Sequence, residues 1–324
     1  MDSKEFSGTL DLLMKVVRIA HSGGVPVLVA GEAPKPRPGP GEVLIEVVAA
    51  GVMLTELSWY PSTHTKTGEP RVGAVPGHDF SGIVAGVGED VGHLEVGHAV
   101  LGMNDWYSDG AMAEYCVAPF FSVLPKFGNL TFVEAASVPI SALTAWQALL
   151  DRAKLRRGEH ILIHGGAGAV GAFAIQIARL YGAHITATAA ARNRDFVARL
   201  GAERVIDYQA SRFEDQAKDM DVVFDTVGGE TLARSWSALK PGGRLVTVVS
   251  TEANSTDPRV RDAFFIVEPN QKELAEIARL LSGGQLRPVV DSVVPFSQVP
   301  DLYAGTAQRR GRGKLVASIS DIYQ

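Results

Sequence analysis

The sequence predicts an α/β protein in which a doubly wound parallel sheet interrupts a β-rich domain. Residues 14–126 form short β-branched segments with a turn roughly every eight to twelve residues, a spacing typical of a compact, barrel-like β domain. From about residue 131, strand and helix patterns alternate, which indicates parallel strands with right-handed helical crossovers. A chain of 324 residues also exceeds what one hydrophobic core usually holds, so we expect two domains.

The β-rich part opens with strands expected at 14–20 and 42–52, on either side of a Pro- and Gly-rich loop. The α/β part opens with a helix expected over 131–153, in which Thr131 is placed to cap and Glu134 stands three residues on. Strands and helices then alternate, with strands expected at 160–164, 184–189, 204–208, 221–228 and 244–250, and helices at 170–181, 194–201, 212–219 and 230–240. A helix over 272–284 and a closing strand over 314–320 follow.

A glycine-rich loop between the first of these strands and its helix predicts a dinucleotide site. Gly166, Gly168 and Gly171 match G-x-G-x-x-G, follow an apolar strand and open an amphipathic helix. Unpaired N–H groups and the positive dipole end of a helix suit a pyrophosphate there. A second glycine-rich stretch, 82–92, has no helical pattern after it, so we interpret it as strand bends.

The end of the second α/β strand predicts which dinucleotide binds. An NAD-binding fold usually has Asp or Glu there, about twenty residues after the glycines, on the ribose 2′-hydroxyl. This chain has four small residues, Thr188 to Ala191, followed by Arg192. A small pocket beside a guanidinium suits a 2′-phosphate, so NADPH is favoured over NADH. The alternative for Arg192 is a solvated charge at a helix start.

Composition excludes several classes of partner. Apolar content of 46%, charged content of 21% and a net charge of −5 are ordinary for a soluble globular protein, with no general attraction to nucleic acid or anionic membrane. The single cysteine, Cys116, rules out an intramolecular disulfide. With neither a secretory signal nor a long apolar run, a cytoplasmic protein is expected. We interpret the basic cluster 309–314 as a solvated turn.

The succession of β domain, nucleotide domain and return to the β domain resembles the medium-chain dehydrogenase/reductase superfamily, and within it the zinc-free quinone oxidoreductases. The motifs that carry the resemblance span almost the whole chain in family order: PGHDFSGIV, EAASVPISALTAWQAL, ILIHGGAGAVG, LGAERVIDY, DVVFDTVGGETLARSWSALKPGGRLV, FFIVEP and RGKLV. The resemblance implies a discontinuous β-rich GroES-like catalytic domain over 1–137 and 268–324, and a doubly wound parallel-sheet Rossmann domain, NADP-binding, over 138–267. The first dozen residues look like an extension.

The resemblance also shows where zinc ligands would be expected in this chain. Alcohol dehydrogenases of this superfamily bind catalytic zinc at positions that match Met53, His78 and Ile140, and only one of these three is a usual zinc ligand. One cysteine cannot build the family's four-cysteine structural lobe. We therefore expect no metal, and we expect His78 and the neighbouring Asp79 to make structural hydrogen bonds.

The family's cofactor contacts carry over residue by residue. The resemblance places the pyrophosphate on the backbone of Gly168, Ala169 and Val170, and it places Ala190 and Arg192 beside the 2′-phosphate. Tyr208 would reach the same phosphate or pack at a strand end. The further expected cofactor residues are Thr144, Gly166, Gly171, Thr226, Val227, Ser250, Phe265, Val267 and Lys314.

The substrate contacts are less defined. Many quinone reductases carry Asn where this chain has Met53, and a thioether is a poor substitute for the hydrogen bond that Asn makes to a substrate or cofactor hydroxyl. The aromatic residues Trp59, Tyr60, Trp106 and Tyr107 suit a flat conjugated acceptor, or else they anchor loops. Tyr60, Tyr107 or solvent could supply a proton, and no catalytic acid is identified.

These observations predict an NADPH-dependent, zinc-free enzyme that transfers hydride to a quinone or an α,β-unsaturated carbonyl compound. Without a Lewis acid, alcohol oxidation is hard, whereas hydride donation to an electron-poor acceptor is feasible. Two alternatives stay open: an enoyl-thioester reductase, and a low-turnover NADPH-binding structural or sensor protein. By analogy with relatives, we expect a homodimer that pairs the sheet edge at 244–250.

Overall fold

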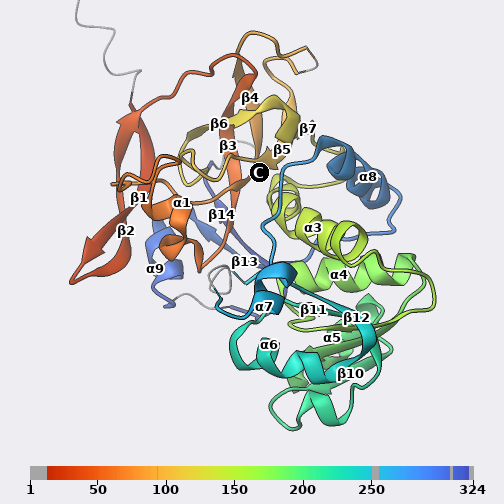
Figure 1. The fold of residues 1–324 in the computed structure, drawn as a ribbon. Helices are drawn as coiled ribbons and strands as arrows, with labels where there is room; N and C mark the ends of the chain where they lie inside the picture. The colour runs from red at the N-terminus through yellow and green to blue at the C-terminus, as the bar shows by residue number, and fades with distance from the viewer. Residues whose placement is uncertain (1–12, 93, 250–254, 307–308, 321–324) are drawn as a thin grey trace, which may run out of the picture. The chain divides into compact units, whose positions relative to one another are not determined.

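The structure, a computed structural model, describes residues 13–92, 94–249, 255–306 and 309–320 (Figure 1). The chain divides into two compact units. The β unit comprises Met1–Pro139, Val290–Arg310 and Leu315–Gln324, and the α/β unit comprises Ile140–Val289 and Gly311–Lys314. The α/β unit thus extends to Val289, beyond residue 267, where the sequence placed its end.

The β unit contains a two-stranded hairpin and a seven-stranded sheet. The hairpin pairs β1 (Leu13–Ser22) with β2 (Val25–Pro34) antiparallel. The sheet has the order β13-β14-β3-β4-β5-β7, with β6 also paired to β3. Its strands are β3 (Glu42–Val52), β4 (Asp79–Val87), β5 (Ala99–Met103), β6 (Tyr115–Pro119), β7 (Val123–Pro125), β13 (Val290–Pro295) and β14 (Lys314–Ser318), and its helices are α1 (Tyr60–Thr63), α2 (Phe132–Ala136) and α9 (Val299–Tyr303).

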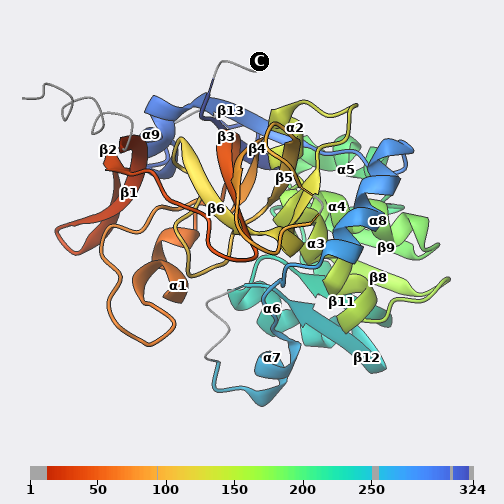
Figure 2. The same cartoon turned by 90° about the horizontal axis from the view of Figure 1, so that it is seen from above.

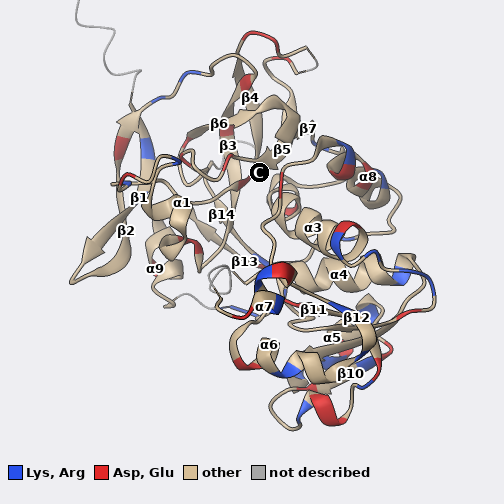
Figure 3. Cartoon of the chain, in the orientation of Figure 1, with Lys and Arg blue, Asp and Glu red and all other residues tan. Residues whose placement is uncertain are grey.

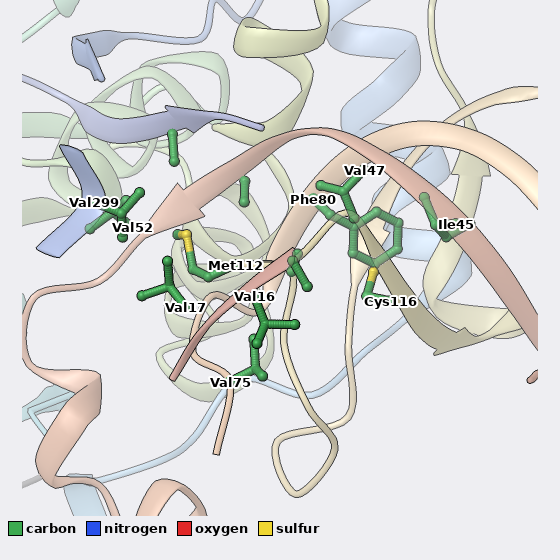
Figure 4. Close-up of a cluster of buried hydrophobic side chains, with 14 of the residues drawn as sticks. Val16, Val17, Ile45, Val47, Val52, Val75, Phe80, Met112, Cys116 and Val299 are labelled. Atoms are coloured by element: carbon green, nitrogen blue, oxygen red, sulfur yellow. The ribbon is translucent and has the colours of Figure 1, made fainter. Parts of the chain in front are cut away.

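An apolar cluster joins the hairpin to the sheet (Figure 4). Ile45, Phe80 and Met112 are fully buried in it, and Val16 of β1 packs in the same cluster. Each such side chain stabilises the fold by about 1.5–3 kcal/mol relative to exposure. Cys116 also lies here, and burial raises the pKa of its thiol to about 12, against the lowering effect of a hydrogen bond with Asn104. The thiol is therefore protonated and unreactive.

The α/β unit is built on a five-stranded parallel sheet of order β10-β9-β8-β11-β12. Figure 2 shows β9, β8, β11 and β12 in succession. The strands are β8 (His160–Ile163), β9 (His184–Ala189), β10 (Arg204–Asp207), β11 (Met220–Asp225) and β12 (Leu239–Thr247), and the helices are α3 (Pro139–Trp146), α4 (Ala169–Leu180), α5 (Arg194–Leu200), α6 (Gly229–Ser235), α7 (Pro258–Ala263) and α8 (Gln271–Ser282). Helices α4 and α5 contact β8, β9 and β10, whereas α6 and α7 contact β11 or β12. This is the doubly wound sheet that the alternating pattern predicted.

Three predicted helices differ in the structure. The helix expected over 230–240 ends as α6 at Ser235, and a 3-10 turn, Trp236–Ala238, leads into β12 at Leu239. The capping box at Thr131 and Glu134 forms as predicted, but the helix over 131–153 is divided into α2, α3 and a wider, π-helical turn over Gln147–Arg152. Pro139 starts α3, where its ring and missing N–H cost nothing. The helix expected over 212–219 is reduced to a single 3-10 turn, Phe213–Asp215.

Helix α8 explains why the α/β unit is longer than predicted. Its buried face consists of Leu274, Ile277, Ala278, Leu280 and Leu281. The side-chain Nε2 of Gln147 donates to the Glu268 carbonyl before α8 and to Glu273 Oε2 in its first turn, both at 2.8 Å. These bonds tie the start of α8 to the segment after α3, within one unit.

Charged residues of both signs are interspersed on α7 and α8 (Figure 3). No helix in the described part of the chain is long and apolar enough to cross a membrane.

Candidate functional site

A cavity of about 710 Å³ opens in the α/β unit beside the residues that follow its parallel strands. Its lining includes His164 and Gly165 after β8, Thr188 at the end of β9, Tyr208 after β10 and Thr226 after β11. The carboxyl ends of parallel strands form the usual ligand crevice of open α/β sheets, at the point where strand order reverses. In this sheet that point lies between β8 and β11.

Three glycines of the loop, Gly165, Gly166 and Gly171, each meet a separate steric demand. Gly165 has a φ of +72°, and a Cβ there would lie 2.4 Å from Thr226 Oγ1. A Cβ on Gly166 would lie 3.0 Å from Ala187 Cβ in β9. A Cβ on Gly171 would lie 2.2 Å from the Gly165 carbonyl oxygen. The loop is therefore folded against the sheet and against its own helix, and a side chain at these positions would open it.

The start of α4 leaves backbone donors next to Gly168, which lines the cavity. Gly168 precedes the helix and has no side chain to cap it. The helical hydrogen bonds begin with the Ala172 amide, which donates to the Gly168 carbonyl at 2.9 Å. Helix geometry leaves the amides of Ala169, Val170 and Gly171 without intrahelical acceptors, so they suit an anion.

His164 links the glycine loop to its surroundings through both ring nitrogens. Ser235 Oγ donates to the Thr231 carbonyl at 2.6 Å and so accepts from His164 Nε2 at 3.0 Å. Nδ1 of the neutral ring then accepts from Thr188 Oγ1 at 3.1 Å. Burial lowers the pKa of His164 to about 4, and the Arg234 charge lowers it further, against the opposing effect of Glu214. The imidazole is therefore neutral at pH 7.

Asp225 fixes the other wall. This fully buried carboxylate ends β11 and accepts from the amides of Val227 and Gly228 at 3.0–3.1 Å and from Thr247 Oγ1 at 2.8 Å. Thr226 Oγ1 donates to the His164 carbonyl at 2.8 Å. These bonds hold Thr226 and the half-exposed Val227 in the cavity wall.

Three arginines and no carboxylate line the cavity within the described residues. Arg212 and Arg234 both bind Glu214, at 2.7 Å and 3.1 Å. Burial alone would raise the pKa of Glu214, but hydrogen bonds from its own backbone, Arg212 and Arg234 lower it, so the carboxylate stays charged. Arg192 is exposed and makes no ion pair with any described residue. Arg192 is thus the lining cation whose charge no carboxylate of the described chain balances.

The basic segment 309–314 was interpreted as a solvated turn, and this was wrong for its central part. Arg312 Nε donates to Asn193 Oδ1 at 3.0 Å, and the Asn193 amide donates to the Gly311 carbonyl at 3.1 Å. The Gly313 amide donates to the Ala167 carbonyl in the glycine loop at 2.8 Å. A Cβ on Gly313 would lie 2.1 Å from the Val289 carbonyl oxygen, so glycine is required there.

The structure gathers part of the predicted cofactor set around the cavity. The predicted residues that line it are Gly168, Ala190, Arg192, Tyr208, Thr226 and Val227. Gly166, Ala169, Val170 and Gly171 belong to the adjoining loop and helix start. Thr144, Phe265, Val267 and Lys314 are buried elsewhere in the α/β unit, and Ser250 lies outside the described residues.

Sequence reasoning missed several lining residues: His164, Gly165, Asn193, Arg212, Phe213, Thr231, Arg234 and Gly311. For His164 and Gly165 a signal existed, because they directly precede the matched glycines. Arg212 and Arg234 follow different strands, and no local pattern in the sequence links them to the glycine loop.

The aromatic candidates lie in the β unit and separate into distinct contacts. The Trp59 and Trp106 rings meet edge to face at 5.6 Å, and Trp106 lies 5.0 Å from the His78 ring. Tyr60 instead stacks on His64 at 4.5 Å. Tyr107 lies under Lys66, whose Nζ is 5.6 Å from the ring. Met53 follows β3, and its carbonyl accepts from the Glu56 amide at 3.1 Å.

A buried carboxylate organises the surroundings of His78, and the sequence did not indicate it. Glu56 is fully buried, accepts from the Gly77 amide at 3.0 Å and lies 3.3 Å from His78 Nδ1. The Tyr303 hydroxyl also donates to Glu56. Burial, followed by the Glu56 charge, raises the pKa of Tyr303 well above its usual value. Asp79, next to His78, is fully buried at the start of β4.

The residues at the family's zinc positions do not fit a catalytic zinc. Met53 offers only a thioether, Ile140 offers no donor, and the Nδ1 atom of His78 faces Glu56. Among the described residues, no three His, Cys, Asp or Glu side chains gather in a way that could hold a metal ion. No step of the chemistry is therefore assigned to a metal.

A glycine loop that opens a helix at the switch point of a doubly wound sheet is the arrangement of a dinucleotide-binding fold. Comparison with known proteins agrees. Residues 39–127 match the alcohol dehydrogenase GroES-like domain, and residues 200–316 match the zinc-binding dehydrogenase family.

Individual relatives cover most of the chain. The mitochondrial NAD(P)H oxidoreductase RTN4IP1 of Danio rerio is 31% identical over 87% of this chain and 84% of its own length. The 2-methylene-furan-3-one reductase of Solanum lycopersicum is 34% identical over 85% of this chain and 71% of its own. The solved quinone oxidoreductase from Coxiella burnetii, 31% identical, matches with a TM-score of 0.82 over 95% of this chain and 100% of its own. The chain belongs to the medium-chain dehydrogenase/reductase family, in its quinone-oxidoreductase-like branch, and is an oxidoreductase by family.

Proposed function

We propose that this protein is an NADPH-dependent, zinc-free reductase of quinones or α,β-unsaturated carbonyl compounds. The observation that carries the cofactor choice is Arg192, an unbalanced cation beside the small residues that end β9. An acid there would bind a ribose 2′-hydroxyl and repel a 2′-phosphate, whereas a guanidinium binds the phosphate. Relatives named for NAD(P)H, enone-type and quinone reduction support the reaction class.

The chain's own residues have defined tasks in this proposal. The amides at the start of α4 bind the pyrophosphate, and Ala190 leaves room for the 2′-phosphate that Arg192 binds. Neutral His164 holds Thr188 and Ser235 in place without adding charge. Thr226 and Val227 support the cofactor beyond the glycine loop. When bound, NADPH supplies a hydride.

The side chains of Met53 and His78 do not form a set of metal ligands, and a site without a metal favours hydride acceptors that are already electron-poor. No residue at these positions replaces a Lewis acid, so an alcohol would keep its high pKa and resist oxidation. A quinone or enone needs only the hydride and a proton, and solvent is a sufficient proton source. Trp59 and Trp106 offer the apolar ring surface that a flat acceptor requires.

A panel of acceptors tests the proposal. Stopped-flow oxidation of NADPH is followed with quinones, enones, enoyl thioesters and simple ketones, each with and without a chelator. We expect turnover with quinones or enones, none with ketones, and no effect of the chelator. Turnover confined to enoyl thioesters would establish the alternative enoyl-thioester reductase. If no acceptor oxidises NADPH, the protein is instead a low-turnover NADPH-binding structural or sensor protein.

We also propose a homodimer that pairs the edge of the α/β sheet. Strand β12 is the last in the sheet order, and apart from a bridge between Thr247 and Phe264 at its end, its outer edge pairs with no strand among the described residues. Light scattering after size exclusion should give twice the 34.5 kDa chain mass. We keep the cytoplasm as the proposed compartment, to be checked by fractionation, while noting that the Danio rerio relative is named mitochondrial.

A further inference from the structure

A second cavity, of about 570 Å³, lies in the β unit and plays no part in the proposed reaction. Its lining residues come from the β1–β2 hairpin and from the segment that runs from the end of α1 to residue 73. Its lining consists of Arg18, Ile19, Ala20, His21, Val29, Thr63, His64, Pro70, Arg71, Val72 and Gly73. No acid occurs among these residues. The volume is within the range usual for small-molecule sites.

Arg18 is the unusual member of this lining. Its Nε atom is buried and has no hydrogen-bond partner, and its guanidinium makes no ion pair with any described residue. Arg244, the other arginine with a buried unpartnered Nε, is balanced by Glu159 at 2.6 Å. A partly buried guanidinium without a counter-charge is costly, and an anion in the cavity would remove that cost.

The backbone holds Arg18 in position. The amide of Ile19 donates to the Ala74 carbonyl at 2.9 Å, which fixes β1 along the segment that ends the cavity. A Cβ built on Gly73 would lie 3.7 Å from Arg18 Cδ, so the arginine side chain runs directly along this glycine. Val29 pairs with Arg18 across the hairpin and lies on the same side.

Arg71 and Thr63, which also line the cavity, are held by partners outside it, which leaves Arg18 as its unbalanced cation among the described residues. Arg71 bonds the Pro61 carbonyl and Asp109, each at 2.8 Å, and so forms a rigid, charge-balanced wall. Thr63 Oγ1 donates to the Trp59 carbonyl at 3.1 Å and therefore accepts from His64 Nδ1 at 2.9 Å. With its proton on Nδ1, the neutral His64 ring has only an acceptor at Nε2 and adds no donor to the cavity, and its face stacks on Tyr60.

The apolar part of the lining indicates what the anion carries. Val29 is 46% exposed and Val72 is 94% exposed, although both are large apolar side chains. Together with Ala20 and Pro70 they give the cavity an apolar side next to its cationic side. We propose that this cavity is a binding site for a small organic anion, a carboxylate or phosphate monoester attached to an apolar group, with Arg18 as its counter-charge.

Calorimetric titration tests the proposal with phenyl phosphate, benzoate and inorganic phosphate as probes. Phenyl phosphate or benzoate should bind the wild type, and inorganic phosphate should bind more weakly because it lacks the apolar part. Arg18→Gln should weaken binding of the organic anion by roughly tenfold or more, the usual range for a charge-assisted hydrogen bond. Lys15→Gln is the matched control, because it removes a charge three residues earlier on β1, outside the cavity.

NADPH affinity, measured on the same samples, should be unchanged in both variants, which shows that the α/β unit is intact. If Arg18→Gln fails to fold, Arg18→Lys and amide chemical shifts take its place. Phenyl phosphate should then shift the amides of Ala20, Val72 and Gly73 in the wild type, and Arg18→Lys should bind it more weakly. The proposal is overturned if neither organic anion binds at millimolar concentration, if the Arg18 variants bind like the wild type, or if the shifts occur elsewhere.

Discussion

His164 shows how one side chain can be essential to a site without taking part in chemistry. It occupies the position between strand β8 and the glycine loop, and its two nitrogens bridge Thr188 and Ser235 from different elements. The ring has to be neutral for Nδ1 to accept, and burial next to Arg234 secures that state. Arg234 itself is held by Glu214, so this ion pair places at the cavity the arginine charge that adds to the effect of burial on the His164 pKa, while the Glu214 charge opposes it.

The depressed pKa of His164 predicts a loss of stability in acid. The folded pKa is about 4, below the usual value of 6.5, so between these values the unfolded chain binds a proton that the folded chain does not. The contribution of His164 to the free energy of unfolding is fully present above pH 6.5. It is lost as the pH falls toward 4, and the total loss is roughly 3 kcal/mol. In urea unfolding at pH 7.5 and pH 5, His164→Gln should lose less stability than the wild type. The exposed His21→Gln is the control, and an equal loss in all three proteins would contradict the account.

At the scale of elements, the glycine loop packs so closely against α4 that no side chain fits between them at Gly171. The Gly171→Ala substitution would place a methyl group 2.2 Å from the Gly165 carbonyl oxygen, so the loop must move away from the helix. We expect a destabilisation of about 1–3 kcal/mol, as for other overpacked sites, and at least tenfold weaker NADPH binding.

Gly128→Ala is the matched control for this change, because a Cβ there meets nothing within 4 Å. Thermal unfolding and fluorescence titration of NADPH measure both effects. Normal stability and affinity in Gly171→Ala would show that the loop does not require the observed packing.

The sequence predicted elements best where the pattern was local. The strand HILI, the glycine triplet and the amphipathic α4 follow one another within 21 residues, from His160 to Leu180, and all formed as predicted. The helix over 212–219 was wrong, because its polar residues serve loop contacts: the Gln216 carbonyl accepts from Arg204 at 2.6 Å. The role of Gly313 against the glycine loop depends on a contact between residues far apart in sequence, which no local pattern reveals.

At the scale of the whole molecule, the family could be predicted from the order in which β-rich and α/β segments follow one another along the chain. The boundaries of the α/β unit depend on tertiary contacts and could not. The α/β unit gained α8 through Gln147 and its two acceptors, and it gained Gly311–Lys314 through Asn193 and Ala167. Conversely, the absence of an acid after β9 and the lack of ligands at Met53 and Ile140 were legible in the sequence, since each concerns residue type alone.

The lone cysteine offers a check on the β unit as a whole. With a pKa of about 12 and full burial, the Cys116 thiol should react with a thiol reagent at pH 8 only when the β unit unfolds. Its labelling rate in urea should therefore follow unfolding, as recorded by circular dichroism. Rapid labelling of the native protein would show that the apolar cluster around Cys116 opens under native conditions.

The central claim, that Arg192 makes this an NADPH protein, is tested most directly by four dissociation constants: NADPH and NADH, each with the wild type and Arg192→Gln. The neighbouring Arg194→Gln, whose guanidinium bonds the Val205 carbonyl at 3.1 Å and does not line the cavity, is the control. We expect the wild type to bind NADPH at least tenfold more tightly than NADH. Arg192→Gln should lose most of that preference through weaker NADPH binding alone, and Arg194→Gln should keep it. A wild type that binds NADH more tightly, or an Arg192→Gln variant with the full NADPH preference, would contradict the account.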